Sequence, residues 1–176
     1  MINPHEAVIE TQRLRVRPPQ SNDAQAMFAM AADWEVAKQT ASVPHPYELT
    51  HAQEWIGRVR DPANGVRWVV ERRSDEMLVG VISIGGTGID DFGYWFGRAH
   101  WGQGYATEAA TAVADFAIDT LEVSEVKAGV FIENLASARV LEKAGFTEGE
   151  TFERTLDHRG GLRQIRRFSR AQKDKT

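Results

Sequence analysis

The chain has 176 residues and a mass of 19.7 kDa, the size of one domain, and its 42% hydrophobic and 26% charged residues are typical of a globular protein rather than a disordered or fibrous one. The absence of cysteine excludes disulfides, thiolate nucleophiles and cysteine-ligated metal sites, and the net charge of −4 argues against a protein that wraps DNA. No apolar stretch reaches the roughly 18 residues of a membrane span, and the N-terminus lacks the basic and then apolar run of a signal peptide, so we expect a cytoplasmic protein without membrane contact.

The first third of the chain predicts one strand and two helices. Arginine alternates with apolar residues over 14–16, the pattern of a half-buried strand, and two prolines end it. Apolar residues then recur at helical spacing over 24–31. After a proline-containing loop over 42–49, Thr50 is expected to cap a second helix, which ends before Pro62.

Strands alternate with helices in the rest of the chain. The expected elements, in chain order, are a hairpin of 68–71 with 78–84, a strand over 92–96, a helix carrying Ala109 to Ala117, a strand over 126–132, a helix over 136–144, and a hairpin from Phe152 that turns at Gly160 and Gly161. Because a helix connects the strands 92–96 and 126–132, a parallel pair with a right-handed crossover is favoured.

The segment from Trp101 to Ala106 joins a predicted strand to a predicted helix and contains Gly102 and Gly104. The first amides of a helix have no acceptor within the helix, and together with the helix dipole they favour an anion such as phosphate. A tight turn without a ligand is the alternative for a Gly-x-Gly pattern taken alone. A P-loop would need Lys and then Ser or Thr after its last glycine, and a dinucleotide fingerprint would need glycine or alanine where Thr107 stands, so both are disfavoured.

Two stretches together resemble a known family. Trp101 to Ala109 (WGQGYATEA) and Asn134 to Phe146 (NLASARVLEKAGF) are similar, in order and spacing, to motifs of the GNAT superfamily of N-acetyltransferases, in particular its RimJ/RimL-like branch. The resemblance extends over nearly the whole chain. It implies an α/β (α+β) fold, a single GNAT-like domain over 1–170 with a mixed, splayed central sheet and flanking helices, followed by a polar tail over 171–176.

The resemblance also implies where acetyl-CoA, the expected co-substrate, binds. It would lie between the strands 92–96 and 126–132, with its pyrophosphate on the amides of the glycine loop and its pantetheine on main chain near Trp95, an addition of a ligand to a strand edge. Cationic side chains would contact the nucleotide phosphates. The residues expected to bind acetyl-CoA are Trp95, Phe96, Gly97, Arg98, Gly102, Gln103, Gly104, Tyr105, Ala106, Thr107, Asn134, Ser137, Arg139 and Lys143.

The chain departs from the wider superfamily at one catalytic position. Many members carry a tyrosine seven residues after the asparagine, which protonates the departing thiolate, and here that residue is Leu141. The resemblance to the RimJ/RimL-like branch gives this role to Ser137, with Asn134 beside it as the second catalytic candidate. The alternative is that Asn134 only caps the helix and that Ser137 is only a residue of its first turn.

Without cysteine, direct attack of an amine on the bound thioester is expected, with the oxyanion stabilised by a backbone N–H of the strand 92–96 and no covalent enzyme intermediate. An α-amine with a pKa near 8 is about 10% neutral at pH 7, whereas a lysine is about 0.04% neutral, so an α-amine needs less help from a base. The candidate bases are Asp91, Glu133, Glu150 and Glu153, and Glu108, in the first turn of its helix, is interpreted as structural. The five histidines lack metal-ligand spacing, so no metal is expected.

The resulting prediction is an acetyl-CoA-dependent N-acetyltransferase that acts on a primary amine, in the first place the N-terminal α-amine of a protein. A small amine (a polyamine, an aminoglycoside or an amino acid) is the alternative acceptor, and a non-catalytic acyl-CoA-binding module is the alternative function. No DNA partner is expected, and pairing of an edge strand into a homodimer is left open. Eight basic residues against two acidic ones from Arg154 onward raise contact with ribosomal RNA as a further hypothesis beside a solvated edge strand.

Overall fold

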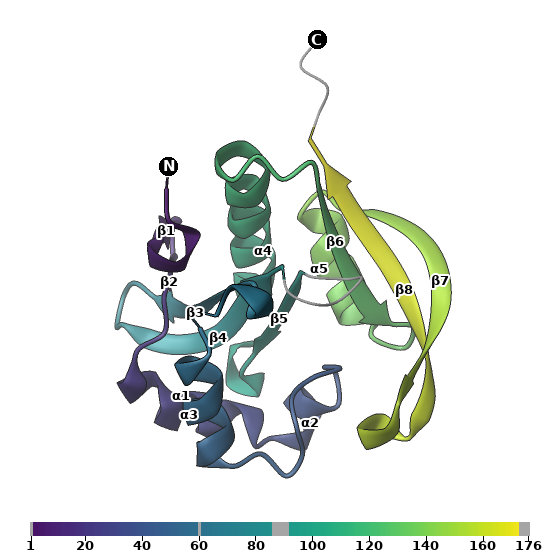
Figure 1. Ribbon diagram of the computed structural model, residues 1–176, viewed down its shortest axis with the longest axis horizontal. Coiled ribbons are helices and arrows are strands. Elements are labelled where there is room, and N and C mark those ends of the chain that lie inside the picture. Colours follow the sequence, from purple (N-terminus) through teal and green to yellow (C-terminus); the bar gives the residue numbers. More distant parts are fainter. Residues whose placement is uncertain (1, 60, 86–91, 173–176) are drawn as a thin grey trace.

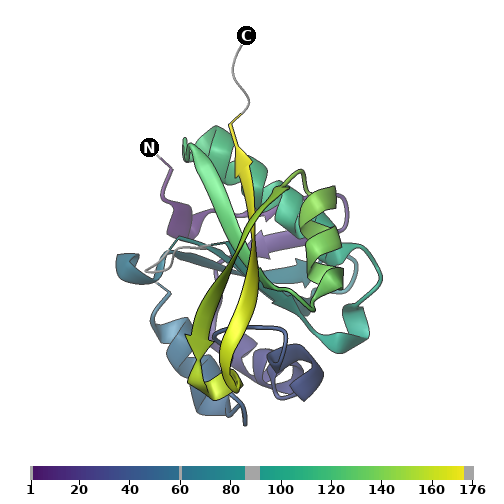
Figure 2. The same ribbon diagram turned by 90° about the vertical axis from the view of Figure 1, so that its right-hand side faces the viewer.

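The computed structural model describes residues 2–59, 61–85 and 92–172 and contains two antiparallel sheets (Figure 1). The first sheet has the order β1-β2-β3-β4-β5 and the second the order β6-β8-β7. The strands are β1 (Ile9–Glu10), β2 (Leu14–Arg17), β3 (Val66–Arg72), β4 (Met77–Ile84), β5 (Gly93–Phe96), β6 (Glu125–Phe131), β7 (Thr147–Leu156) and β8 (Gly161–Ala171). In Figure 2 the second sheet lies in front of the first.

Helices cover both faces of the first sheet. They are α1 (Ala24–Ala31), α2 (Trp34–Ala37), α3 (Leu49–Gly57), α4 (Tyr105–Asp115), which continues into a π-helical turn at Phe116–Thr120, and α5 (Leu135–Lys143). Short 3₁₀ turns occupy Pro4–Glu6, Ser21–Asp23, Pro62–Asn64, Arg98–His100 and Asp157–Arg159. Among the described residues, no helix is both long enough and apolar enough to cross a membrane.

Strand β3 shows why the sheet is buried on both sides. Trp68 and Val70 pack into the main core, which contains residues of α4 and α5, whereas Val69 packs into a second core under α1 and α3. All three side chains are fully buried, so β3 reads as a continuous apolar run rather than as an alternating pattern. The main core also includes Phe168 of β8, and it therefore connects the two sheets.

Most of the predicted elements are present, with shifted ends. The second helix begins at Leu49 because Glu48, and not Thr50, is its N-cap, in a reciprocal arrangement in which Glu48 N–H donates to His51 Nδ1. The last hairpin begins at Thr147, five residues before the predicted start. The prediction missed these residues because they are exposed and show no apolar alternation. Strand β8 runs to Ala171, one residue into the expected tail, and residues 173–176 lie outside the described ranges.

The expected parallel pairing of the strands 92–96 and 126–132 is wrong for the described residues, because β5 and β6 are edge strands of two separate antiparallel sheets that splay apart. Within the described ranges, the two sheets share one backbone hydrogen bond, from Phe92 N to Lys127 O at 2.8 Å. Beyond this point β5 and β6 diverge toward the lower part of the molecule in Figure 1. The GNAT-like fold with a splayed sheet is therefore confirmed, and the divergence leaves one edge of each strand open.

Candidate active site

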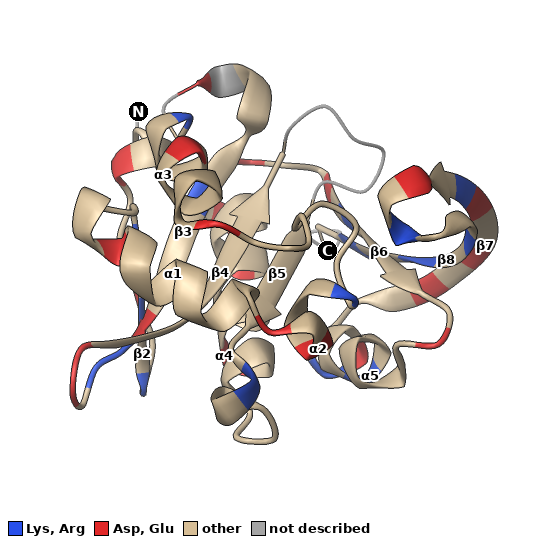
Figure 3. Cartoon of the chain, turned by 90° about the horizontal axis from the view of Figure 1, so that it is seen from below, with Lys and Arg blue, Asp and Glu red and all other residues tan. Residues whose placement is uncertain are grey.

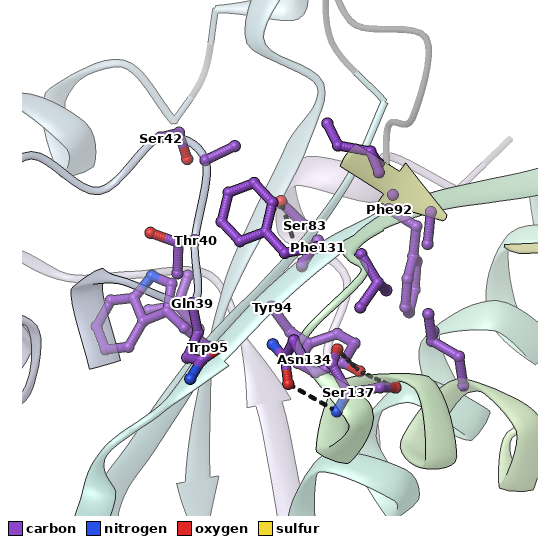
Figure 4. A pocket seen from close by; sticks show the side chains of 18 of the residues that line it. Gln39, Thr40, Ser42, Ser83, Phe92, Tyr94, Trp95, Phe131, Asn134 and Ser137 are labelled. Carbon is purple, nitrogen blue, oxygen red and sulfur yellow. Dashed lines mark hydrogen bonds between the residues drawn. The ribbon is translucent and has the colours of Figure 1, made fainter. Parts of the chain in front are cut away.

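A cavity of about 290 Å³ lies where β5 and β6 separate (Figure 4). One wall is β5 with Gly93, Tyr94 and Trp95, and the opposite wall is β6 from Ala128 to Phe131. The start of α5 and the segment 39–42 close two further sides. The site thus gathers residues that lie far apart in the sequence, from Gln39 to Ile165.

The backbone edge of β5 offers donors to this cavity at alternate residues. Gly97 N donates to Val79 O at 3.0 Å, and the antiparallel register with β4 directs the backbone groups of Gly93 and Trp95 to the same side. The N–H groups of Tyr94 and Phe96 consequently face the cavity side, as does that of Phe92, which bonds to β6. Of the predicted pantetheine contacts, Phe96 thus presents its N–H to the cleft, whereas Gly97 uses its own on β4.

Strand β6 presents a complementary edge. Ile132 N donates to Gln164 O at 3.1 Å, so the same alternation directs the backbone N–H and C=O of Gly129 away from β8 and toward the cavity that Gly129 lines. An extended ligand with amide groups, such as pantetheine, can therefore hydrogen bond to both strands where they no longer reach each other.

The glycine loop has the geometry of an anion site. Gly102 and Gly104 have φ of +74° and +80°, which favours glycine at both positions. The helix α4 starts at Tyr105, and its first hydrogen bond runs from Glu108 N to Gly104 O at 3.1 Å, so the amides of residues 105–107 have no acceptor within the helix. The predicted loop residues from Gly102 to Thr107 are thus arranged to receive a pyrophosphate.

Arg13, which the sequence reasoning missed, fixes this loop. Its guanidinium donates to Gln103 O at 2.8 Å and lies over the ring of Tyr105 at 4.7 Å. Glu108 in turn accepts hydrogen bonds from Arg13 Nε at 2.7 Å and from Thr11 Oγ1 at 2.6 Å. Burial favours the neutral form of the Glu108 carboxyl, but these bonds outweigh it and lower its pKa. The structural role predicted for Glu108 is confirmed.

The two predicted catalytic residues lie together at the start of α5. Asn134 Oδ1 accepts from Ser137 N at 3.1 Å and caps the helix, and both side chains line the cavity (Figure 4). Ser137 Oγ lies 2.8 Å from the hydroxyl of Tyr94. Burial raises the pKa of Tyr94, so its phenol stays protonated at any physiological pH. Figure 4 shows both contacts as dashed lines.

Tyr94 therefore places a phenol at the site from strand β5, whereas Ser137 and Leu141 belong to helix α5. Leu141, at the position of the superfamily's tyrosine, also lines the cavity and is fully buried, so it contributes apolar surface and no proton. The predicted nucleotide contacts Arg98, Arg139 and Lys143 are exposed and do not line the cavity. Arg98 lies in the turn after β5 and forms a loose ion pair with Asp33 at 3.9 Å.

The base candidates that the structure describes lie outside the cavity. Glu133 pairs with Arg163, Glu150 pairs with Arg167, and Glu153 accepts from Gln164. Asp91 is outside the described residues. The residues that line the cavity include no Asp, Glu or His among those described. The site thus offers an amine a polar, partly aromatic surface without a carboxylate base.

Four arginines of β8 form ion pairs with carboxylates, two of them on β7 and the other two on α4 and on the turn after β6. Besides the pairs of Arg163 and Arg167, Arg166 pairs with Glu148 at 3.4 Å and Arg170 with Asp115. Figure 3 shows blue and red segments beside one another on β7 and β8. The prediction of a solvated edge strand is wrong for the arginines themselves, because β8 is the central strand of its sheet and its paired arginines are half-buried; this pairing also argues against a surface for ribosomal RNA.

The turn between β7 and β8 is tied to the segment that borders the cavity. Arg159 is 7% exposed and donates to Thr40 O and Ala37 O, both at 2.9 Å, and to Val43 O. Burial lowers the pKa of its guanidinium, which has only carbonyl oxygens as acceptors. The neighbouring His158 ring contacts Ala41 O at 2.5 Å. These contacts hold the segment 37–43 beside the cavity between β5 and β6.

Comparison with known proteins agrees with this geometry. Residues 13–147 match the profile of the acetyltransferase (GNAT) domain. The chain belongs to the GNAT family. It is an acetyl-CoA-dependent N-acetyltransferase, with acetyl-CoA as the co-substrate of the family. Its open strand edges and its glycine loop suit that co-substrate.

Individual relatives support the assignment. The chain is 29% identical over 145 residues to an uncharacterized N-acetyltransferase, YoaA, of Bacillus subtilis, covering 79% of this chain and 82% of YoaA. A GNAT-family acetyltransferase from Bacillus anthracis superimposes with a TM-score of 0.82 at 21% identity, over 94% of this chain and 98% of that one. RimL, a ribosomal-protein α-N-acetyltransferase solved with coenzyme A, superimposes with a TM-score of 0.79 at 13% identity, over 94% and 98%. The last two, both below 25% identity, show a shared fold.

Proposed function

We propose that this GNAT enzyme acetylates the N-terminal α-amine of a protein. The observation that carries the proposal is the cavity itself, whose described lining residues contain no carboxylate and no histidine. An α-amine is already about 10% neutral at pH 7, whereas a lysine side chain would depend on a base. The fold shared with RimL, whose name specifies an α-N-acetyltransferase, supports the same choice.

The chain's own groups suggest how the reaction is assisted. The N–H of Tyr94 faces the cleft and can donate to the thioester oxygen as negative charge develops there. The attacking amine enters from the side of the segment 39–42, opposite the start of α5. After attack, the nitrogen loses its extra proton to water, because the described lining residues provide no base.

Ser137 is proposed to give its hydroxyl proton to the departing sulfur as the carbon–sulfur bond breaks, and to regain a proton from water, to which the amine nitrogen has lost its own. Tyr94 has two possible acceptors, Ser137 Oγ at 2.8 Å and Ser137 O at 3.3 Å, and its raised pKa keeps its hydroxyl a donor. When Tyr94 donates to Ser137 Oγ, the serine proton is free to point to the sulfur and becomes a better donor, since linked hydrogen bonds strengthen one another. Tyr94 is thus a positioning residue for Ser137.

Release of the CoA thiol in the presence of defined acceptors tests the function. Short peptides with free α-amines, the same peptides with blocked α-amines, and a panel of polyamines, aminoglycosides and free amino acids are compared by kcat/KM. The proposal predicts release with free α-amines and loss of release after blocking, even when a lysine remains in the peptide. Release with the small amines alone would overturn it and identify a small-molecule acetyltransferase.

A further inference from the structure

A second cavity of about 270 Å³ adjoins the first on the side of α1 and α3. Ser42, Trp55 and Trp95 line both cavities, so the two are immediate neighbours that meet at these side chains. The second cavity lies beyond the segment 39–42, on the side from which we expect the acceptor to enter. An acceptor with its amine in the first cavity would place its next groups in the second.

Hydrogen-bond donors dominate the lining of the second cavity. Arg58, Arg67, Tyr47 and His51 all line it. Tyr47 is 8% exposed, and burial raises its pKa to about 12, so its hydroxyl remains protonated. His51 Nδ1 accepts from Glu48 N at 2.9 Å, which leaves the ring proton on Nε2. Each of these groups can donate to an anion.

Arg67 is the cation placed deepest in this wall. Its guanidinium lies 5.2 Å from the centre of the Trp55 ring and donates to Trp55 O at 3.4 Å and to Asn64 Oδ1 at 3.2 Å. Among the described residues, no carboxylate lies within 4.0 Å of it. Burial, and after it the positive charge of Arg58, lower the pKa of Arg67, while the negative charge of Asp61 acts in the opposite direction.

Glu54 is the one carboxylate among the described residues that line the second cavity, and it already forms an ion pair with Arg58. Glu54 is 63% exposed and pairs with Arg58 at 3.8 Å, a loose contact in solvent. Asp61, which also acts on Arg67, accepts hydrogen bonds from Ala63 N and Asn64 Nδ2. Neither carboxylate neutralises the guanidinium of Arg67 directly. A carboxylate of the acceptor could therefore bind the guanidinium of Arg67, which stacking on Trp55 already holds in position.

We propose that the second cavity binds an acidic side chain close behind the acceptor amine, so that the enzyme prefers protein N-termini with Asp or Glu among their first residues. This selection rests on the proposed function, since it assigns the residue that follows the acetylated one. Arg67 is the main contact, and Arg58, Tyr47 and His51 complete the set of donors.

The test uses peptide amides that differ only in Glu or Gln at position 2, and a second pair that differ at position 3. Because the C-termini are amidated, the glutamate is the only carboxylate. The proposal predicts a kcat/KM about tenfold higher for the glutamate peptide of at least one pair, equivalent to about 1.4 kcal/mol. Arg67→Gln is expected to abolish the preference, so that the glutamate and glutamine peptides react with equal kcat/KM.

Lys127→Gln is the matched control, because it removes the same unit charge from an exposed site that lines neither cavity, and it should keep the full preference. If Arg67→Gln fails to fold, Arg58→Gln serves as a second variant and should weaken the preference by about threefold. Equal rates for glutamate and glutamine at both positions would overturn the proposal. So would a preference that persists in Arg67→Gln.

A binding measurement separates this proposal from the proposed function. Titration calorimetry of the acetylated peptide products, with CoA present, reports on the second cavity without turnover. Preferential binding of the glutamate product in the absence of any peptide acetylation would support the anion site and contradict the α-amine function. Equal binding of both products together with peptide acetylation would contradict the anion site alone.

Discussion

The hydroxyl of Ser137 is within hydrogen-bond distance of the hydroxyl of Tyr94, which can orient it. A serine in the first turn of a helix is a weak acid by itself. Here its oxygen lies 2.8 Å from the phenol of Tyr94, which stays protonated because burial raises its pKa. The sequence indicated Ser137 and Asn134 through a local motif. It could not indicate Tyr94, which is 43 residues earlier on β5 and meets Ser137 only after α5 packs against that strand.

A double-mutant cycle tests whether Tyr94 acts through Ser137. We expect Ser137→Ala to lower kcat about 100-fold and Tyr94→Phe about tenfold, with the KM for acetyl-CoA nearly unchanged, because proton transfer to the leaving group is impaired and donor binding is not. In the Ser137→Ala background, Tyr94→Phe should have no further effect. Effects that multiply in the double variant would show that the two residues act separately.

The pH dependence tests the absence of a base in the cavity. For a peptide acceptor, kcat/KM should rise about tenfold per pH unit below the pKa of its α-amine, near 8, and then level off, since only the neutral amine attacks. Tyr94 remains protonated throughout this range because its pKa is raised. The inflection should move when an acceptor with a different amine pKa is used. An inflection that stays in place would reveal a titrating group of the enzyme.

At the scale of elements, we propose that the glycine loop binds the pyrophosphate of acetyl-CoA and that the open strand edges bind its pantetheine. The loop was predictable, because Gly102 and Gly104 lie directly before a helix and the motif is contiguous. Its support by Arg13 was not, because Arg13 lies 90 residues from Gln103, the loop residue whose carbonyl it binds. The free edge of β5 also depends on tertiary structure, since the divergence from β6 decides which amides remain open.

Gly104→Glu tests the loop as the pyrophosphate site. A carboxylate at this position should repel the phosphates, so acetyl-CoA should no longer raise the melting temperature. Gly104→Gln is the control, because it shares the strain of φ +80° and the approach of a Cβ to Arg13 at 3.3 Å but adds no charge. We expect the glutamine variant to keep part of the stabilisation. Equal stabilisation of both variants by acetyl-CoA would place the phosphates elsewhere.

The turn between β7 and β8 gives a second test at this scale. Arg159→Met leaves the carbonyls of Ala37, Thr40 and Val43 without their donor and should lower the free energy of unfolding by about 2 kcal/mol. Arg154→Met, on the exposed face of the same hairpin, should change it by less than about 0.5 kcal/mol. Urea denaturation measures both. A stability loss no larger than that of Arg154→Met would show that Arg159 does not hold the segment 37–43.

At the scale of the whole molecule, side-chain packing joins two sheets that share one backbone hydrogen bond in the described part of the chain. The order of strands and helices was predictable from periodicity and turn residues, as the hairpin of β3 and β4 illustrates. The splay was predicted through the family resemblance and not from periodicity, because it results from the way α4, α5 and Phe168 fill the space between the sheets. The early start of β7 was hidden because its exposed residues have no apolar pattern.

Phe168→Ala tests this coupling. Phe168 is fully buried in β8, and its truncation should lower the free energy of unfolding by about 3–5 kcal/mol. All five tryptophans precede residue 102, so tryptophan fluorescence reports on the other sheet and its helices. We expect the fluorescence and circular dichroism transitions to shift together to lower urea. A fluorescence transition that stays at its original urea concentration would show that the sheets unfold independently.

A crystal structure of the enzyme with CoA tests the central claim most directly. The account predicts the pyrophosphate on the amides of residues 103–107, the pantetheine between β5 and β6 with hydrogen bonds to main chain of Phe96 and Gly129, and the sulfur next to Ser137 Oγ. A pantetheine that lies outside the cleft, or a sulfur that is separated from Ser137 by another side chain, would contradict it.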